Sequence, residues 1–260
     1  MNLYAGFLRK SFLQRFMFRS EVVLEILGNL IQMLVRVSIW TALLAGGSQR
    51  GITLETMITY TILGFIVGTL TRTNLGNALA GRVQSGMIAL DLIRPVNLKF
   101  YLMCEDFSNN LYRLITSGVI VTVVSVLVWE IMPAEPLTLA AFIVAVMLGV
   151  WIMYSIDFAM GMLVFWTENA TFLRMAKSGL FTVFAGHMIP LWFYPDWLLR
   201  ITNFLPFRFV VFEPIAIYTG YASMSVGNIL LVQLLWIAIL AVIQMLMWSR
   251  VRNRIFVQGG

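Results

Sequence analysis

Histidine, cysteine and charge are all scarce in this sequence. The 260 residues include one histidine, His187, and one cysteine, Cys104. A single histidine excludes a multi-histidine metal site, and a single cysteine excludes a disulfide within the chain. Charged residues make up 12% of the chain, against about 25% in soluble domains, whereas hydrophobic residues make up 60%. Composition this apolar cannot be buried in one soluble core, so the sequence predicts an integral membrane protein.

Motifs for catalysis are also missing from the sequence. It has no G-x-S-x-G nucleophile turn, no H-E-x-x-H zinc motif and no glycine-rich dinucleotide fingerprint. The phosphate-binding G-x-x-x-x-G-K-[ST] loop is absent too, so any nucleotide hydrolysis must come from another chain. We therefore expect no catalytic, metal-binding or cofactor-binding residue here. His187, close to Pro190, is interpreted as a hydrogen-bonding residue at the membrane interface rather than as a base.

Six stretches are long and apolar enough to cross a bilayer, which takes about 20 helical residues. They cover residues 22–45, 55–76, 107–131, 137–166, 173–193 and 226–248. We therefore expect an all-α integral membrane protein, with one transmembrane domain over residues 1–260 and a cytoplasmic tail over 249–260. The basic and aromatic residues of 1–21 favour a helix lying on the inner membrane surface, the alternative being an extension of the first span.

The distribution of basic residues predicts the orientation. The connections on one side of the six spans and the two ends of the chain carry thirteen Lys and Arg residues, and the other side carries three, Arg50, Arg200 and Arg208. Positive residues concentrate on the cytoplasmic side, so both termini are expected in the cytoplasm, which requires an even number of crossings. The net charge of +6 follows from this placement, and we expect membrane lipid rather than nucleic acid as a partner.

Prolines divide the segment between the fifth and sixth spans. Residues 194–225 are apolar and aromatic, but Pro195, Pro206 and Pro214 cut them into pieces too short to span. Each proline removes a backbone donor and disfavours a continuous helix. We expect two short re-entrant helices that enter the outer leaflet without crossing it, covered by protein or lining a wet cavity.

Four polar residues share one face of the first span: Glu25, Asn29, Gln32 and Arg36. A charge at the bilayer centre costs at least ~2.5 kcal/mol, so this face must meet protein or water. It forms either a polar seam between helices or subunits, or one wall of a substrate path. The depths of Arg36 and Asp157 in their spans also suggest a buried ion pair between them.

Two glycines of the second span, Gly64 and Gly68, form a G-x-x-x-G motif. Small residues at this spacing allow two helices to approach closely. The motif serves helix packing within the subunit or, alternatively, a contact between two subunits.

A short, half-polar helix is expected in the connection 77–106, which contains "GMIALDLIRP". Two turns end before Pro95, because the residue before proline disfavours the helical region. A helix this short is marginal in water and needs a docking surface, the alternative being the lipid headgroups. Charged residues would set its register and apolar ones anchor it; the residues concerned are Arg82, Asp91, Leu92, Ile93, Arg94 and Pro95.

The motifs "GMIALDLIRP", "PLWFYPDWL" and "LPFRFVVFEPIAIYTG" resemble bacterial ABC type-2 exporter permeases of about this length. The resemblance implies a dimer of permeases, identical or related, docked on two separately encoded ATP-binding-cassette ATPases that hold ATP and Mg. It implies a coupling helix with Asp91, Leu92, Arg94 and Pro95 in the ATPase groove. It also implies an extracellular gate in the outer helices, at positions Pro195, Trp197, Pro206, Phe207 and Pro214.

These observations together predict the permease subunit of an exporter in the bacterial cell membrane. Its substrate is expected to be amphipathic: a peptide, a drug-like molecule or a lipid-linked compound. One alternative is a secondary transporter driven by an ion gradient, although no inverted repeat is visible. Another is a non-transporting membrane scaffold or immunity protein. Recovery of an ATPase with the chain would separate these readings.

Overall fold

The structure is a computed structural model that describes residues 19–48, 51–93, 97–129, 131, 133–167 and 170–258. Within these ranges the chain is helical and contains no β-strand, with 82% of residues in helices. The all-α prediction is confirmed. The predicted surface helix over residues 1–21 lies almost wholly outside the described residues.

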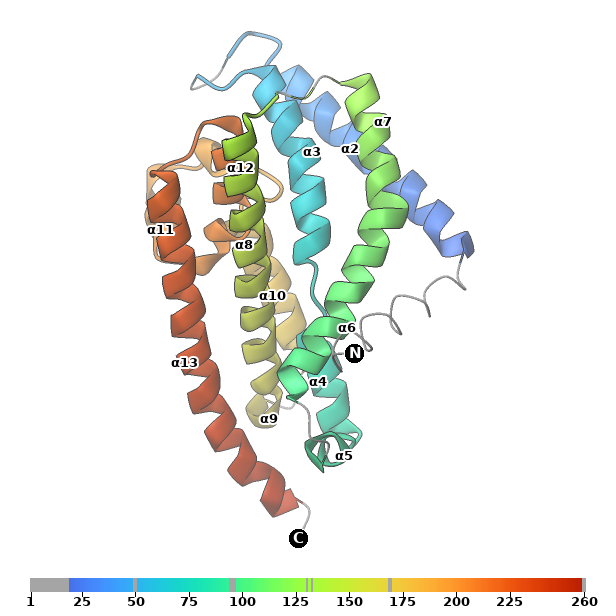
Figure 1. The fold of residues 1–260 in the computed structure, drawn as a ribbon, viewed down its shortest axis with the longest axis vertical. Helices are drawn as coiled ribbons and strands as arrows, with labels where there is room; N and C mark the ends of the chain where they lie inside the picture. The colour runs from blue at the N-terminus through green and yellow to red at the C-terminus, as the bar shows by residue number, and fades with distance from the viewer. Residues whose placement is uncertain are drawn as a thin grey trace.

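The elements follow one another with short connections (Figure 1). In chain order they are α2 (Arg19–Leu43), α3 (Leu54–Thr71), α4 (Leu75–Gln84), α5 (Ile88–Ile93), α6 (Leu98–Arg113), the π-helical turn η2 (Leu114–Gly118), α7 (Val119–Val128), α8 (Pro136–Met162), α9 (Val164–Thr167), α10 (Ala170–Phe184), the 3₁₀ turn η3 (Leu191–Phe193), α11 (Asp196–Asn203), the 3₁₀ turn η4 (Pro206–Phe209), α12 (Phe212–Thr219) and α13 (Val226–Gln258).

Five stretches of the described chain are long and apolar enough to cross a membrane: Val22–Leu43, Leu54–Gln84, Leu98–Val128, Pro136–Thr167 and Val226–Val251. The predicted fifth span, 173–193, corresponds to α10, which has 15 residues. At ~1.5 Å per residue it is about 22 Å long, less than the ~30 Å hydrocarbon core. Six crossings and re-entrant outer helices therefore stay predictions.

Two predicted boundaries were wrong. Residues 77–84, expected in a connection, belong to α4, because Leu79 and Ala80 are buried in the packed interior. The third span begins at Leu98 rather than 107, since Leu98, Leu102 and Met103 bury one face of α6. The last apolar stretch, Val226–Val251, lies close to the predicted 226–248, and the helix itself continues to Gln258.

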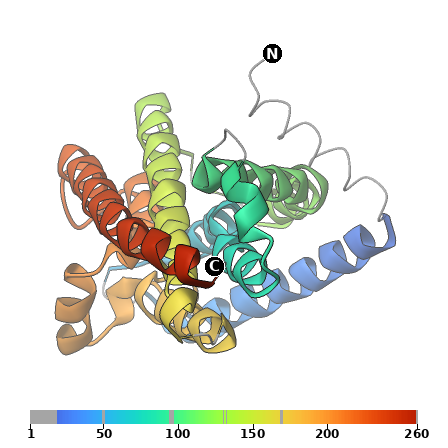
Figure 2. The same cartoon turned by 90° about the horizontal axis from the view of Figure 1, so that it is seen from below.

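Helix α8 lies at the centre of the packing, against α4, α10, α12 and α13 (Figures 1 and 2). It is buried along its second half, where Ile152 to Phe158 form a continuous buried run. Glycines allow the close approaches. A Cβ built on Gly149 would lie 2.9 Å from the carbonyl oxygen of Val210, so only glycine fits where α8 crosses this backbone.

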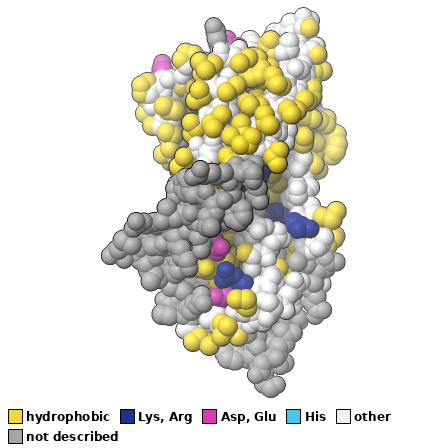
Figure 3. Space-filling model, turned by 90° about the vertical axis from the view of Figure 1, so that its right-hand side faces the viewer, with side chains coloured by type: hydrophobic (Ala, Val, Ile, Leu, Met, Phe, Trp, Pro, Cys, Tyr) yellow, Lys and Arg dark blue, Asp and Glu magenta, His cyan; other side chains and the backbone are white. Residues whose placement is uncertain are grey.

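Helices α2 and α7 lie at the edge of the molecule and pack on α3 and on each other. Their outer faces are apolar and exposed, as at Leu24 (72%) and Leu127 (81%). Hydrophobic side chains cover most of the upper part of the face shown in Figure 3, and the visible Lys and Arg side chains lie below them. An apolar surface this large needs a lipid environment, so the chain is a multi-pass membrane protein.

Two ends of the molecule are named for their place in Figure 1. The lower end carries α5 and the C-terminal part of α13, and the upper end carries the α2–α3 and α7–α8 connections. The short elements α11 and α12 lie in the upper half of the molecule.

Candidate functional site

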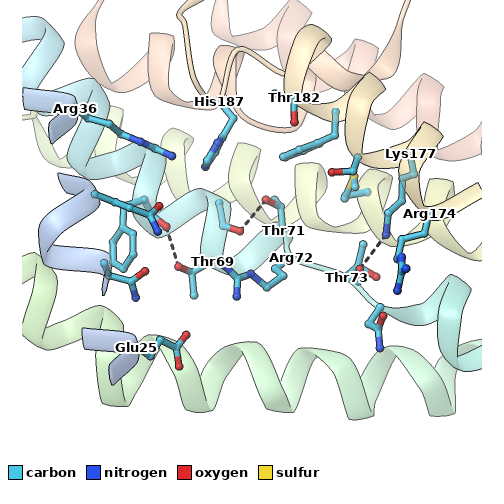
Figure 4. Close-up of a pocket in the computed structure, with 18 of the residues that line it drawn as sticks. Glu25, Arg36, Thr69, Thr71, Arg72, Thr73, Arg174, Lys177, Thr182 and His187 are labelled. Atoms are coloured by element: carbon cyan, nitrogen blue, oxygen red, sulfur yellow. Dashed lines mark hydrogen bonds between the residues drawn. The ribbon is translucent and has the colours of Figure 1, made fainter. Parts of the chain in front are cut away.

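A polar cavity of about 450 Å³ lies among α2, α3, α4 and α10 (Figure 4). One wall is the predicted polar stripe of α2. The other lining side chains come from the end of α3, the start of α4, α8, α10 and the segment that follows α10. The charged and imidazole groups are Glu25, Arg36, Arg72, Arg174, Lys177 and His187.

All four α2 residues of the stripe, Glu25, Asn29, Gln32 and Arg36, line this cavity. Their face thus lines a cavity within the same chain. Glu25 also lies near a basic residue of α6, with its Oε1 3.9 Å from the Nε of Arg113. Within the described part of the chain, no three His, Cys, Asp or Glu side chains are grouped so as to hold a metal ion.

Asp157 is buried beside the cavity and has a different partner from the one expected. Its Oδ1 lies 2.6 Å from Nζ of Lys177 in α10. The hypothesised Arg36–Asp157 pair is therefore corrected to Lys177–Asp157. Depth along a helix predicts the height of a side chain in the membrane, but it does not predict which neighbouring helix the side chain faces.

The same carboxylate holds the break between α3 and α4. Thr73 donates its hydroxyl to Asp157 Oδ2 at 2.9 Å, and the backbone N–H of Gly76 donates to the same oxygen at 3.1 Å. The N–H of Asn74 donates to Asp106 Oδ2 at 2.7 Å. Two carboxylates thus receive N–H groups at the start of α4, where a helix leaves its donors unsatisfied and attracts negative charge.

Asn110 of α6 donates hydrogen bonds to backbone carbonyl groups at the end of α3, before the break. Its side-chain amide donates to the carbonyl oxygens of Leu70 (3.3 Å) and Arg72, and to the Tyr154 hydroxyl at 2.9 Å. The carbonyl groups at the end of α3 therefore have a fixed partner. The bend between α3 and α4 is tied to α6, α8 and α10 at once.

The predicted short helix is present as α5, Ile88–Ile93, at the lower end. Asp91 is only 7% exposed and faces inward, where its Oδ2 lies 2.8 Å from Nη1 of Arg82 in α4. Arg82 also lies 3.6 Å from Glu105 and stacks over the Tyr101 ring at 5.2 Å. These contacts fix α5 to α4 and α6.

The outward side of α5 is apolar. Met87 before the helix and Leu90 and Ile93 within it are 55%, 61% and 80% exposed. Ile93 thus stands where an anchor was expected, and Leu90 joins it. Arg94 and Pro95, together with the side chain of Leu92, lie outside what the structure describes.

The residues expected to form an outer gate occupy different environments. Pro195 precedes the first turn of α11, and Trp197 is 64% exposed. Pro206 and Phe207 are buried in η4, and Pro214 is buried in α12. The structure brings the last three together with the core and leaves Trp197 on the surface.

A buried ion pair that we did not predict holds this segment. The guanidinium of Arg208 pairs with Glu213, which is 0% exposed, and also bonds to Asn203 and, at 2.9 Å, to the Ser223 hydroxyl. Ser223 in turn donates to Glu213 at 2.5 Å. Arg208 had been counted only as an outer basic residue. The signal in the sequence was the opposite charge five positions later in an otherwise apolar run.

Both glycines of the G-x-x-x-G motif face this chain's own residues. A Cβ on Gly64 would lie 3.9 Å from Ile215 of α12, and a Cβ on Gly68 would overlap the His187 ring. The geometry places the motif against neighbours within the subunit. His187 lies close to Gly68 and points into the cavity (Figure 4).

The fold and the cavity together define the class: a polytopic helical membrane protein with a polar chamber among its helices. The family model described as "ABC-2 family transporter protein" matches residues 26–259. Because the match covers nearly the whole sequence, the chain belongs to this family of ABC transporter permeases. A comparison with curated proteins found no match. Family membership implies a transport component that works with ABC ATPase subunits.

Proposed function

We propose that this chain is the permease subunit of an exporter that moves an amphipathic substrate out of a bacterial cytoplasm. A second permease, either another copy of this chain or a related chain, would supply the other transmembrane domain of the pathway. ATP and Mg would be held by two separate ATPase chains. The observation that carries this proposal is the apolar outward side of α5, presented at one end of a molecule that belongs to a transporter family.

Charge supports a cytoplasmic position for α5. Arg82 lies in the last turn of α4, directly before α5, and Arg250 lies near the end of α13, which also reaches the lower end. With the sequence excess of basic residues on this side, the lower end would face the cytoplasm. Both termini would then be cytoplasmic, and the segment from Pro195 to Pro214 would lie at the outer side as a gate.

The contacts of α5 suggest how motion would reach the cavity. A push on α5 would pass to α4 through the Arg82–Asp91 pair, and α4 packs on α8 and leads directly to the break beside the cavity. Nucleotide binding could bias inward- and outward-open states only through its different affinity for the two. The permease would contribute two alternative arrangements of these helices.

Replacing Leu90 and Ile93 together with aspartate tests the docking surface. We expect the ATPase that co-purifies with the wild-type chain to be lost, because two charges would be placed in an apolar interface. The measurement is the amount of ATPase recovered per permease from native membranes. Leu137→Asp is the control, since Leu137 is equally exposed (81%) but begins α8 at the upper end. Retention of the ATPase by the double variant would contradict the proposal, and ion-driven transport by the chain alone would favour a secondary transporter.

Exchanging the charges of Arg82 and Asp91 tests the link between α5 and α4. Each single variant, Arg82→Asp or Asp91→Arg, places two like charges side by side and should reduce ATP hydrolysis coupled to substrate. The double exchange restores opposite charges and should recover part of the coupling. Equal activity of the single and double variants would show that the pair does not transmit motion.

A further inference from the structure

Three arginines of the cavity have no acidic partner in the described residues. Arg36 comes from α2, Arg72 follows α3 and Arg174 lies in the first turns of α10. Arg36 is half-buried and extends into the cavity toward His187, whereas Arg72 and Arg174 line the cavity as exposed residues (Figure 4). No ion pair of the described chain includes any of the three.

The nearby acidic groups have other partners. Glu25 lies beside Arg113, and Asp157 is paired with Lys177 at 2.6 Å. Asp106 accepts the backbone N–H of Asn74. Among the residues that line the cavity, three arginines and Lys177 stand against one carboxylate, Glu25, so its lining carries an excess of positive charge.

Such an excess is costly in a membrane protein. A charged side chain among membrane helices is unfavourable unless water or an opposite charge meets it. Arginine presents a planar fork of donors that suits phosphate and carboxylate oxygens. The side-chain amide of Asn29 and the hydroxyl of Ser178 on the same walls could complete the hydrogen bonding.

The two helices that flank the cavity are apolar on their outer sides. On α2, Leu27 and Ile31 are 52% and 60% exposed, and on α10, Phe172 and Met175 are 62% and 68% exposed. A molecule with its charged part in the cavity would thus have lipid-compatible surfaces beside it. A small inorganic ion, by contrast, would contact the arginines but not the apolar flanks of α2 and α10.

We propose that this cavity binds the anionic headgroup of an amphiphile, a phosphate-bearing lipid-like molecule, through Arg36, Arg72 and Arg174. The inference rests on the proposed permease function and names its substrate class. The headgroup would enter the polar chamber, and the acyl chain would stay against the apolar flanks of α2 and α10.

The test uses the full-length chain in nanodiscs of zwitterionic phosphatidylcholine. Its affinity is measured for a fluorescent monoacylglycerol phosphate and for the matched monoacyl phosphocholine, which carries no net charge. We expect the phosphate probe to bind the wild-type chain about 10-fold more tightly, because its additional negative charge would accept charge-assisted hydrogen bonds from the arginines. An excess of inorganic phosphate should leave its binding unchanged.

Variants locate the site. Arg36→Gln with Arg72→Gln should weaken binding of the phosphate probe about 10-fold. Arg36→Lys with Arg72→Lys, which keeps the charge, should restore most of it and shows that the cavity is still folded. The control, Arg200→Gln with Arg250→Gln, removes the same charge from exposed residues outside the cavity and should bind as wild type.

Three results would overturn the proposal: equal affinity for the two probes, wild-type affinity in the cavity Gln variant, or displacement of the probe by inorganic phosphate at comparable concentration. The last would assign the arginines to a soluble anion. Because the assay needs no ATPase, its failure is distinct from failure of the permease proposal, which the loss or retention of the ATPase at α5 decides.

Discussion

Asp157→Ala is expected to destabilise the protein by about 3–5 kcal/mol, the usual cost of breaking a buried ion pair by removing one partner. Lys177 is 9% exposed and would keep its charge with no counter-charge at 2.6 Å. The Thr73 hydroxyl and the Gly76 N–H would lose their shared acceptor. We therefore expect the bend between α3 and α4 to loosen and substrate transport to be lost.

The measurement is the thermal unfolding midpoint in detergent, followed by tryptophan fluorescence or by the loss of the monodisperse peak. Asp196→Ala is the control, because Asp196 is exposed at the start of α11. The double variant Asp157→Ala with Lys177→Met removes both charges and should recover part of the lost stability. A midpoint for Asp157→Ala equal to that of the control would show that the pair does not hold the bend.

Much of the fold follows from patterns within single segments. Apolar runs of about twenty residues predicted the membrane helices, since only a helix satisfies its backbone groups in lipid. The spacing of Glu25 and Arg36 predicted one polar face on α2, and that face lines the polar cavity. Pro95, with the polar residues before it, predicted a short separate helix, which is α5.

Partners between distant segments could not be predicted in this way. Lys177, near the start of the predicted fifth span, is buried against Asp157, and nothing in its own segment indicates this partner. The helix α4 was interpreted as a loop because its own residues are only weakly apolar, and it is stabilised by packing on α8. Arg208 was predicted only to lie on the outer side, and its pairing with Glu213 depends on how η4 packs onto α12. Each error concerns a contact between two helices, which depends on the rotation of each helix about its own axis.

Gly161→Ala is expected to have the second large effect, because α4 and α8 touch backbone to backbone at this glycine. A Cβ on Gly161 would lie 2.7 Å from Cα and 3.0 Å from the carbonyl oxygen of Gly76. Rigid backbone cannot yield as a flexible side chain can, so α4 must move away from α8. Overpacking of this kind costs about 1–3 kcal/mol.

The displacement matters more than the energy, because Gly76 donates its N–H to Asp157 from the same point of contact. Moving α4 would weaken that bond and shift α5, so we expect ATP hydrolysis to continue while transport falls, together with a lower unfolding midpoint. Gly179→Ala is the matched control. Gly179 lies in α10 with no atom within 4 Å of an added Cβ, and alanine there should raise helix stability by up to about 1 kcal/mol. If both variants behaved alike, close contact between α4 and α8 would not be what couples α5 to the cavity.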